Sequence, residues 1–201
     1  LLGWAPEGEQ EIFSLDEMIK IWDPARISKS PAIFDPLKLR AINAAYIRAL
    51  PAEEFRKLAD PFIDQAVHVQ IDRDLLCANL QPRCEVLEDI PPQLDFFDAV
   101  LPIDAEMYRN KKQKTTPESA KEALSALLPV LKAQTDWSRD AIFEACKQKA
   151  EAMEKKNGWL LFPLGIALSG KARTPGGGTD LAAMMGKEET LRRLNAAIEA
   201  L

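Results

Sequence analysis

Apolar residues recur every three or four positions along most of the chain, which is the period of an amphipathic helix. The first such stretch begins at Ser14 and Glu17, which have the spacing of a capping box ahead of Met18, Ile19 and Trp22. The side-chain oxygen of the serine can accept from the amide three residues on, while the glutamate reaches back to the serine amide. The pattern therefore predicts a helix that starts after Ser14.

Proline marks the next boundaries. Asp35 followed by Pro36 predicts a helix that begins there and ends before Pro51. A further helix is expected over residues 52–58, and Pro61 is expected to separate it from another over residues 62–71.

The second half keeps the helical period and has its own start and stop signals. Thr116 followed by Pro117 predicts a helix start, and Ser138 is expected to cap a helix that ends at residues 157–158, an Asn-Gly pair. A last helix is expected after Gly186. Since no segment of useful length alternates apolar and polar residues, the predicted fold class is all-α.

The composition is that of a folded globular protein. Of 201 residues, 47% are hydrophobic and 28% charged, which excludes a collagen-like or mostly disordered chain. Pro163 breaks the longest apolar run, so no membrane association is expected. No basic and apolar leader opens the chain, and its three widely spaced cysteines suggest reduced thiols, so a cytoplasmic location is expected. The chain begins at Leu1 rather than at Met, which suggests a piece of a longer protein.

The charge is unevenly distributed along the chain. The net charge of −5 divides into −9 over residues 1–105, with 10 basic and 19 acidic side chains, and +4 over residues 106–201, with 16 and 12. The densest basic run, residues 109–114, is typical of a solvated turn.

Patterns of catalytic residues are mostly absent. His68 is the single histidine; its apolar neighbours place it on the predicted helix over 62–71 and favour a structural role. The cysteine spacing does not fit a zinc site. Residues 165–172 (GIALSGKA) nearly match a phosphate-binding loop, but Ala172 lacks the hydroxyl that would bind Mg²⁺. The glycine cluster at residues 175–180 is typical of a flexible loop that ends at a helix cap.

Several stretches nevertheless form an ordered series of motifs. They are LGW at residues 2–4, EIFSL at 11–15, RISKSPAIFDPLKL at 26–39, RCEVL at 83–87, FPLGIALSGK at 162–171 and GKEETLRRL at 186–194. Together they resemble the C-terminal, RNA-binding half of the bacterial glutamyl-tRNA synthetases over essentially the whole chain. In that family the Ser-Lys-Ser of residues 28–30 lies downstream of the loop that closes on ATP.

The resemblance implies a fold, a partner and a division of the chain. The fold would be a helical tRNA stem-contact part over residues 1–78, then two small helical anticodon-binding subdomains over 79–134 and 135–201. The partner would be the glutamate-accepting tRNA, with no DNA and no membrane, and the protein would be a monomer. The parent enzyme would use ATP and magnesium to charge the tRNA, whereas no catalytic residue, cofactor or metal is expected in these residues.

The resemblance also implies site residues. Arg83 matches the family arginine that reads the third anticodon base, for which the residue-level alternative is a surface arginine at a helix start. Gly165 departs from the family, which usually has arginine there, so the recognition of the first anticodon base would fall to other side chains. The expected anticodon contacts are Arg83, Lys171, Arg173, Thr174, Pro175 and Leu181, and the expected stem contacts are Lys29, Asn43 and Arg48.

Two other functions stay open at this point. An all-α protein-interaction or scaffold module would account for the acidic N-terminal half, although not for the ordered motifs. A paralogue that charges the tRNA for glutamine is a variant within the same family. Salt-dependent RNA binding separates the first alternative from a tRNA-binding protein.

Overall fold

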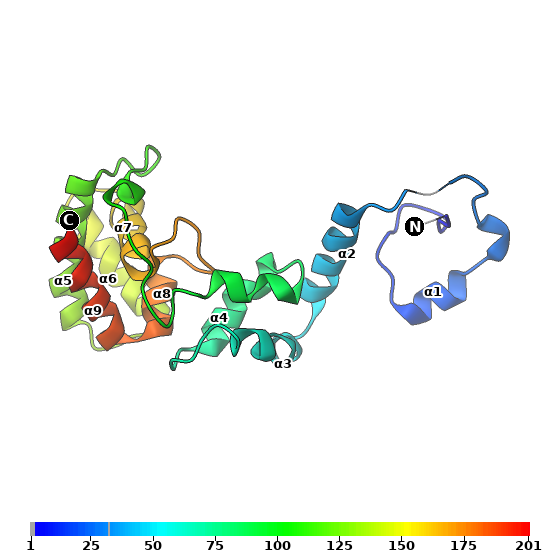
Figure 1. Ribbon diagram of the computed structural model, residues 1–201, viewed down its shortest axis with the longest axis horizontal. Helices are drawn as coiled ribbons and strands as arrows, with labels where there is room; N and C mark the ends of the chain where they lie inside the picture. The colour runs from blue at the N-terminus through cyan, green and yellow to red at the C-terminus, as the bar shows by residue number, and fades with distance from the viewer. Residues whose placement is uncertain (1–2, 32) are drawn as a thin grey trace.

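The computed structural model describes residues 3–31 and 33–201, and helices are the regular secondary structure of these residues (Figure 1). The prediction of an all-α fold is confirmed: the described residues contain no strand, only an isolated bridge between Asn110 and Thr115. In Figure 1 the molecule is elongated, with the N-terminal helix at one end and the C-terminal helices packed together at the other. Leu2 and Ala32, which belong to two of the family motifs, lie outside the described residues.

The first region contains one short helix and long connections. Helix α1 (Leu15–Ile21) starts with the predicted capping box, in which the Ser14 hydroxyl accepts from the Glu17 amide. None of its residues is buried. The connections are held by side chains such as Trp4, whose Nε1 donates to the Asp23 carbonyl oxygen at 3.0 Å. A 3-10 turn, η1 (Pro24–Arg26), follows before the chain reaches the second helix.

Helices α2 (Pro36–Ala49) and α3 (Ala52–Ile63) form the middle of the molecule. Asp35 caps α2 as predicted, accepting from the Leu37 and Lys38 amides. The expected break at Pro61 is wrong, because α3 continues through it to Ile63. A proline this close to a helix end removes a single backbone hydrogen bond, while Phe55, Ala59 and Ile63 bury the apolar face of the helix.

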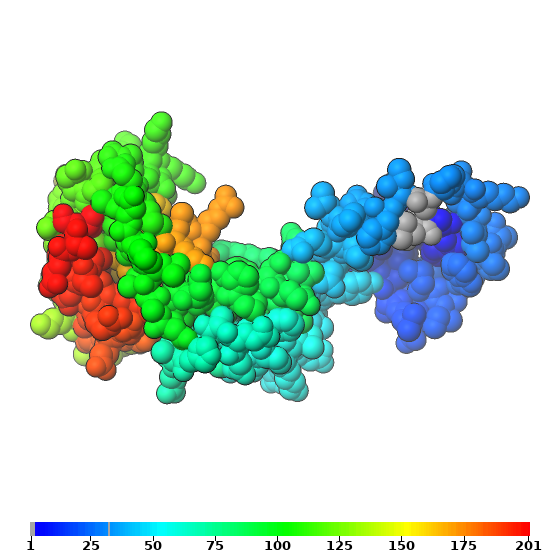
Figure 2. Space-filling view, viewed as in Figure 1, coloured from blue at the N-terminus to red at the C-terminus, as the bar shows by residue number. Residues whose placement is uncertain are grey.

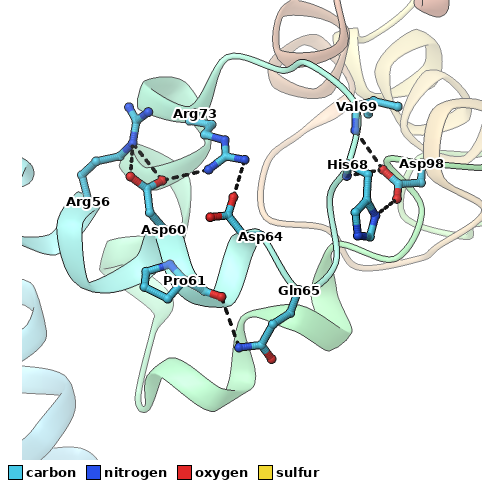
Figure 3. Close-up of polar contacts among 9 residues, drawn as sticks. All are labelled: Arg56, Asp60, Pro61, Asp64, Gln65, His68, Val69, Arg73 and Asp98. Carbon is cyan, nitrogen blue, oxygen red and sulfur yellow. Dashed lines mark hydrogen bonds and ion pairs between the residues drawn. The ribbon is translucent and has the colours of Figure 1, made fainter.

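The expected helix over residues 62–71 is also wrong, since the chain after α3 is irregular up to Asp72. His68 therefore lies on a loop, with its side chain 72% exposed. Asp98 holds this loop: its carboxylate accepts from the His68 and Val69 amides and contacts His68 Nδ1 at 2.5 Å (Figure 3). These hydrogen bonds lower the pKa of Asp98.

Helix α4 (Arg73–Leu80) leads into residues 81–108, which we call the middle segment. It consists of the short 3-10 turns η2 (Gln81–Arg83), η3 (Leu87–Asp89), η4 (Pro91–Gln93) and η5 (Ala105–Tyr108). Its apolar side chains, among them Ile90, Leu94 and Phe96, are fully buried and join the core that continues into the C-terminal helices. The middle segment therefore connects the two ends of the molecule through packing as well as through the chain.

The C-terminal helices pack against one another as a bundle. They are α5 (Pro117–Ala133), α6 (Arg139–Ala152), α7 (Asn157–Ser169), α8 (Gly178–Met185) and α9 (Lys187–Ala200). Thr116 caps α5 and Ser138 caps α6, as predicted. Helix α7 contacts each of the other four. Eight of its 13 residues are buried, which is why it is apolar all round.

One boundary in the bundle differs from the prediction. Helix α6 ends at Ala152, and the Asn-Gly pair at residues 157–158 begins α7 instead of ending α6. Glu154 takes the left-handed conformation there, with φ of 54°. The expected helix end at residues 157–158 is therefore wrong, because this pair forms the first turn of α7.

A buried arginine ties the bundle to the middle segment. Arg193 on α9 is 1% exposed. Its Nη1 donates to the carbonyl oxygens of Phe96 and Leu168, its Nη2 donates to that of Phe97, and its Nε lies 2.5 Å from Glu189 Oε1. The buried guanidinium is thus compensated by three carbonyl acceptors and by Glu189, whose side chain is partly exposed.

Candidate functional site

A cavity of about 630 Å³ opens between α7, the middle segment and the loop that connects α7 to α8. We call residues 170–177 the α7–α8 loop. Figure 2 shows this part of the chain, in orange, at the surface beside the green middle segment. The lining residues are Arg83, Gln93, Leu161, Phe162, Gly165, Ile166, Lys171, Ala172, Arg173, Thr174, Gly176, Gly177 and Gly178.

Two glycines on facing helices form a backbone wall of the cavity. A Cβ atom on Gly178 would lie 2.8 Å from the Leu161 carbonyl oxygen and 2.9 Å from the Gly165 nitrogen, so the approach of α8 to α7 requires glycine there. A Cβ atom on Gly165 would lie no closer than 3.8 Å to Gly178, which is an ordinary contact. Packing therefore does not require Gly165, but the missing side chain leaves the cavity open.

Arg83 connects the middle segment to the α7–α8 loop. Its Nη1 donates to the carbonyl oxygens of Thr174 and Pro175, at 3.3 and 3.0 Å. Its Nη2 makes no hydrogen bond with any described residue, and the side chain stands at the wall of the cavity. Arg83 can therefore hold the loop with one nitrogen and present the other to a ligand, because a guanidinium carries five donors in a planar fork.

The two other cations of the cavity differ in their partners. Lys171 Nζ donates to the Pro92 carbonyl oxygen at 2.8 Å and forms an ion pair with Asp95. Arg173 is exposed, and its guanidinium makes no hydrogen bond or ion pair with the described residues. Lys171 thus serves to fix the start of the loop, whereas the charge of Arg173 faces solvent.

Other expected site residues are distributed more widely. Thr174 lines the cavity, and Pro175 is buried beside it. Leu181 is fully buried in α8 and does not line the cavity. The expected stem contacts Lys29, Asn43 and Arg48 are exposed on or just before α2, which Figure 1 places away from α7 and α8. Asn43 Nδ2 donates to the Glu85 carbonyl oxygen at 2.6 Å, so part of its hydrogen-bonding capacity is used within the fold.

The sequence gives no site role to several lining residues, among them Gln93 and the apolar residues Leu161, Phe162 and Ile166. In the sequence Phe162 and Ile166 are part of an apolar motif, and Gln93 follows a pair of prolines without any signal of its own. Its Nε2 donates to the Asp89 carbonyl oxygen at 2.6 Å, which leaves its side-chain oxygen as an acceptor at the cavity. Only the packing of the middle segment on α7 shows that these residues share a site.

A second polar cluster lies outside the cavity, between α3 and α4 (Figure 3). Asp60 bridges Arg56 and Arg73, and Asp64 lies 2.6 Å from Arg73 Nη2. Each charge in this cluster has a partner of opposite sign, so the cluster joins two helices rather than presenting a charged surface.

The chemistry of the described residues is that of binding. Among them, no group of three or more histidine, cysteine, aspartate or glutamate residues could hold a metal ion. The three cysteines are buried, and burial raises the pKa of Cys146 to about 12, which disfavours the reactive thiolate. In the described part of the chain, no helix is both long and apolar enough to cross a bilayer.

Comparisons with known proteins agree with the motif series. Residues 43–198 match the family described as anticodon binding domain. The whole chain is 43% identical to 41% of the glutamate–tRNA ligase of Clostridium botulinum, and 43% identical to 42% of that of Clostridium acetobutylicum. The whole chain also superimposes on 39% of a solved glutamate tRNA ligase from Elizabethkingia meningosepticum, with a TM-score of 0.82 and 28% identity.

A second solved structure, the glutamate-tRNA synthetase of Elizabethkingia anophelis, matches 99% of the chain with a TM-score of 0.79 and 27% identity. These matches confirm the resemblance inferred from the motifs. The chain spans about two fifths of the length of the curated relatives that it matches.

Proposed function

The chain belongs to the family of anticodon binding domains, and from this premise we propose that it is the tRNA-binding, anticodon-reading region of a glutamate–tRNA ligase. The observation that carries the proposal is the cavity beside the α7–α8 loop. Proteins that read single-stranded RNA bind unstacked bases by stacking and by hydrogen bonds to their edges. The cavity offers an apolar wall, a backbone wall and a wall of cations.

The apolar wall consists of Leu161, Phe162 and Ile166 and can cover the face of a base. The Nη2 of Arg83 and the side-chain oxygen of Gln93, which also belong to residues that line the cavity, can bond the edge of that base. A guanidinium can bond two acceptors of one base at once, which glutamine cannot do in the same way. Arg83 is therefore our candidate for discrimination of the third anticodon base.

The remaining parts of the proposal concern the rest of the chain. Lys29, Asn43 and Arg48 would contact the backbone of the tRNA stem, since phosphate contacts position an RNA without reading its sequence. Residues 1–78 would form the stem-contact part, and residues 79–134 and 135–201 the two anticodon-binding subdomains. We propose a cytoplasmic monomer with tRNA as its partner.

The charging reaction is proposed for the whole ligase, with ATP and Mg²⁺ as its cofactors. The described residues do not fit these groups. Residues 165–172, which nearly match a phosphate-binding loop, form the last turn of α7 and the start of the α7–α8 loop instead of a loop ahead of a helix. No cluster of metal-ligating side chains is present in the described part of the chain either. We therefore assign no catalytic step to these residues.

Fluorescence anisotropy with glutamate tRNA transcripts tests the proposal. We expect binding that weakens as salt rises, because phosphate contacts release counter-ions. We also expect it to weaken when the third anticodon base is changed, and Arg83→Gln should remove that difference. Arg109→Gln, which changes an exposed arginine far from the cavity, is the matched control and should keep the difference.

Two results would contradict the proposal. Absence of binding at low salt would favour the scaffold module. Equal binding of both transcripts by the unchanged protein would leave Arg83 as a structural residue that only holds the α7–α8 loop. The comparisons do not favour either the scaffold module or the paralogue that charges the tRNA for glutamine.

A further inference from the structure

We propose that Arg173 is a phosphate-binding residue at the rim of the cavity, and that it holds the backbone of the nucleotide whose base enters the cavity. This inference rests on the proposed tRNA binding and adds a role for one residue. Three observations support it. The three cations that line the cavity differ in their partners, hydrogen bonds hold the α7–α8 loop on both sides of Arg173, and the apolar groups of the cavity are separate from its exposed charge.

The three cations differ in how much charge they can offer to RNA. The ammonium group of Lys171 is paired with Asp95 and bonded to the Pro92 carbonyl oxygen. Arg83 uses Nη1 to hold the carbonyl oxygens of Thr174 and Pro175. Arg173 has no such partner among the described residues, so a phosphate can bind it without first breaking an ion pair.

The loop on both sides of Arg173 is anchored. Before it, the Lys171 amide donates to Ser169 Oγ at 3.0 Å. After it, Thr174 Oγ1 donates to the Gly176 carbonyl oxygen at 2.6 Å, and Arg83 holds the Thr174 carbonyl. The backbone of Arg173 is thus positioned before RNA arrives, which reduces the ordering cost of binding.

The cavity also orients a nucleotide. Its apolar side chains and the Gly165–Gly178 wall come from α7 and α8, whereas Arg173 is exposed. A nucleotide lowers its energy by turning its base toward the apolar wall and its phosphate toward solvent and cation. The acidic residues that contact the loop have other partners: Asp95 pairs with Lys171, and Asp180 accepts from the Gly177 amide and pairs with Arg139.

A phosphate contact and a base contact give different signatures. Loss of a phosphate contact weakens binding to all sequences alike and lowers the salt dependence, whereas loss of a base contact relaxes specificity at one position. The test therefore measures the tRNA affinity of Arg173→Ala and Arg173→Lys over a series of salt concentrations. It uses the glutamate transcript and transcripts in which each anticodon base is changed in turn. Arg192→Ala, an exposed arginine on α9, is the control.

We expect Arg173→Ala to weaken binding about fivefold for every transcript and to reduce the slope of log affinity against log salt by roughly 0.7, the value for one single-strand phosphate. Arg173→Lys should bind nearly as well as the unchanged protein, since a phosphate accepts a point charge. Arg192→Ala should leave both quantities unchanged.

Three outcomes overturn the inference while leaving tRNA binding intact: unchanged affinity in Arg173→Ala, a loss confined to one anticodon sequence, or no recovery in Arg173→Lys. Absence of tRNA binding by the unchanged protein would instead reject the proposed function, and the role of Arg173 with it. Circular dichroism of each variant shows whether its helices are retained.

Discussion

The N-terminal region, residues 3–31 and 33–50, and the C-terminal bundle, residues 117–201, both contain helices but are stabilised in different ways. In α1 no residue is buried, whereas α7 buries eight of its 13 residues. The large hydrophobic side chains that stand exposed in the described structure lie between Ile12 and Val69, and the most exposed of them, Ile33, is 91% accessible.

This difference shows that helix signals and helix burial are separate properties. Helix α1 has a complete capping box, yet a single seven-residue helix gains little from a cap when none of its residues is buried. The helices of the bundle gain most of their stability from the apolar faces that they share. We therefore expect the two regions to differ in local stability, and four experiments can break or sharpen that expectation.

The largest effect is expected in amide hydrogen exchange. Amides of α1 should exchange at least about a hundredfold faster than the central amides of α5 and α7, because opening α1 exposes no core. Exchange detected by mass spectrometry on the native protein measures this. Equal protection of α1 and α7 would show that the N-terminal region is as stable as the bundle.

The second effect concerns two arginines that each form an ion pair with a glutamate but differ in burial. Arg193→Ala should lower the free energy of unfolding by about 3–5 kcal/mol, because it removes a buried charge on which Glu189 and three carbonyl oxygens depend. Arg26→Ala in the N-terminal region should cost less than about 1 kcal/mol, since its ion pair with Glu7 is exposed. Urea denaturation measures both values, and similar costs would contradict the comparison.

A pair of leucines tests the apolar contribution alone. Leu124→Ala in α5 should cost about 2–5 kcal/mol, because the side chain is fully buried and a cavity remains. Leu15→Ala in α1 should cost less than about 0.5 kcal/mol, because Leu15 is 75% exposed. A large loss of stability in Leu15→Ala would mean that α1 packs against another surface in solution.

The smallest effect is a pH dependence in the bundle. Hydrogen bonds from Arg192 and Arg193 lower the pKa of Glu189 from 4.5 to about 2. A carboxyl group with a lowered pKa stabilises the fold above its unfolded pKa, and this contribution is lost as the pH falls toward the folded value. Urea midpoints should therefore fall between about pH 4.5 and pH 2, and Glu189→Gln should show a shallower fall. Parallel curves for the two proteins would exclude Glu189 as the source.

Local signals predicted the starts of the four helices named next, because the atoms that form a cap lie within three or four residues of one another. Ser14, Asp35, Thr116 and Ser138 each cap the helix expected of them. The wrong predictions concern signals whose meaning depends on neighbours in space. Pro61 did not end α3, because Phe55, Ala59 and Ile63 bury this helix on both sides of the proline, and the Asn-Gly pair after α6 begins a helix with eight buried residues.

The candidate site shows the same division. The family resemblance implied Arg83, Lys171, Arg173 and Thr174 as site residues, and these side chains do line one cavity. How much of each charge a ligand can reach depends on partners that are distant in sequence. Asp95 forms an ion pair with Lys171, and two loop carbonyl oxygens accept from the Nη1 of Arg83. No motif contains that information, since a motif records residue types and not their contacts.

By itself, then, the sequence determined the helical fold class, the starts of α1, α2, α5 and α6, and the family, because periodicity, caps and motifs are properties of short stretches. The tertiary structure alone decided which of those helices have a core, that Leu181 is buried, and that Arg173 at the cavity has no partner among the residues that the structure describes. Burial and ion pairing depend on contacts between segments that are far apart in the chain. These contacts form only when the middle segment packs against the bundle.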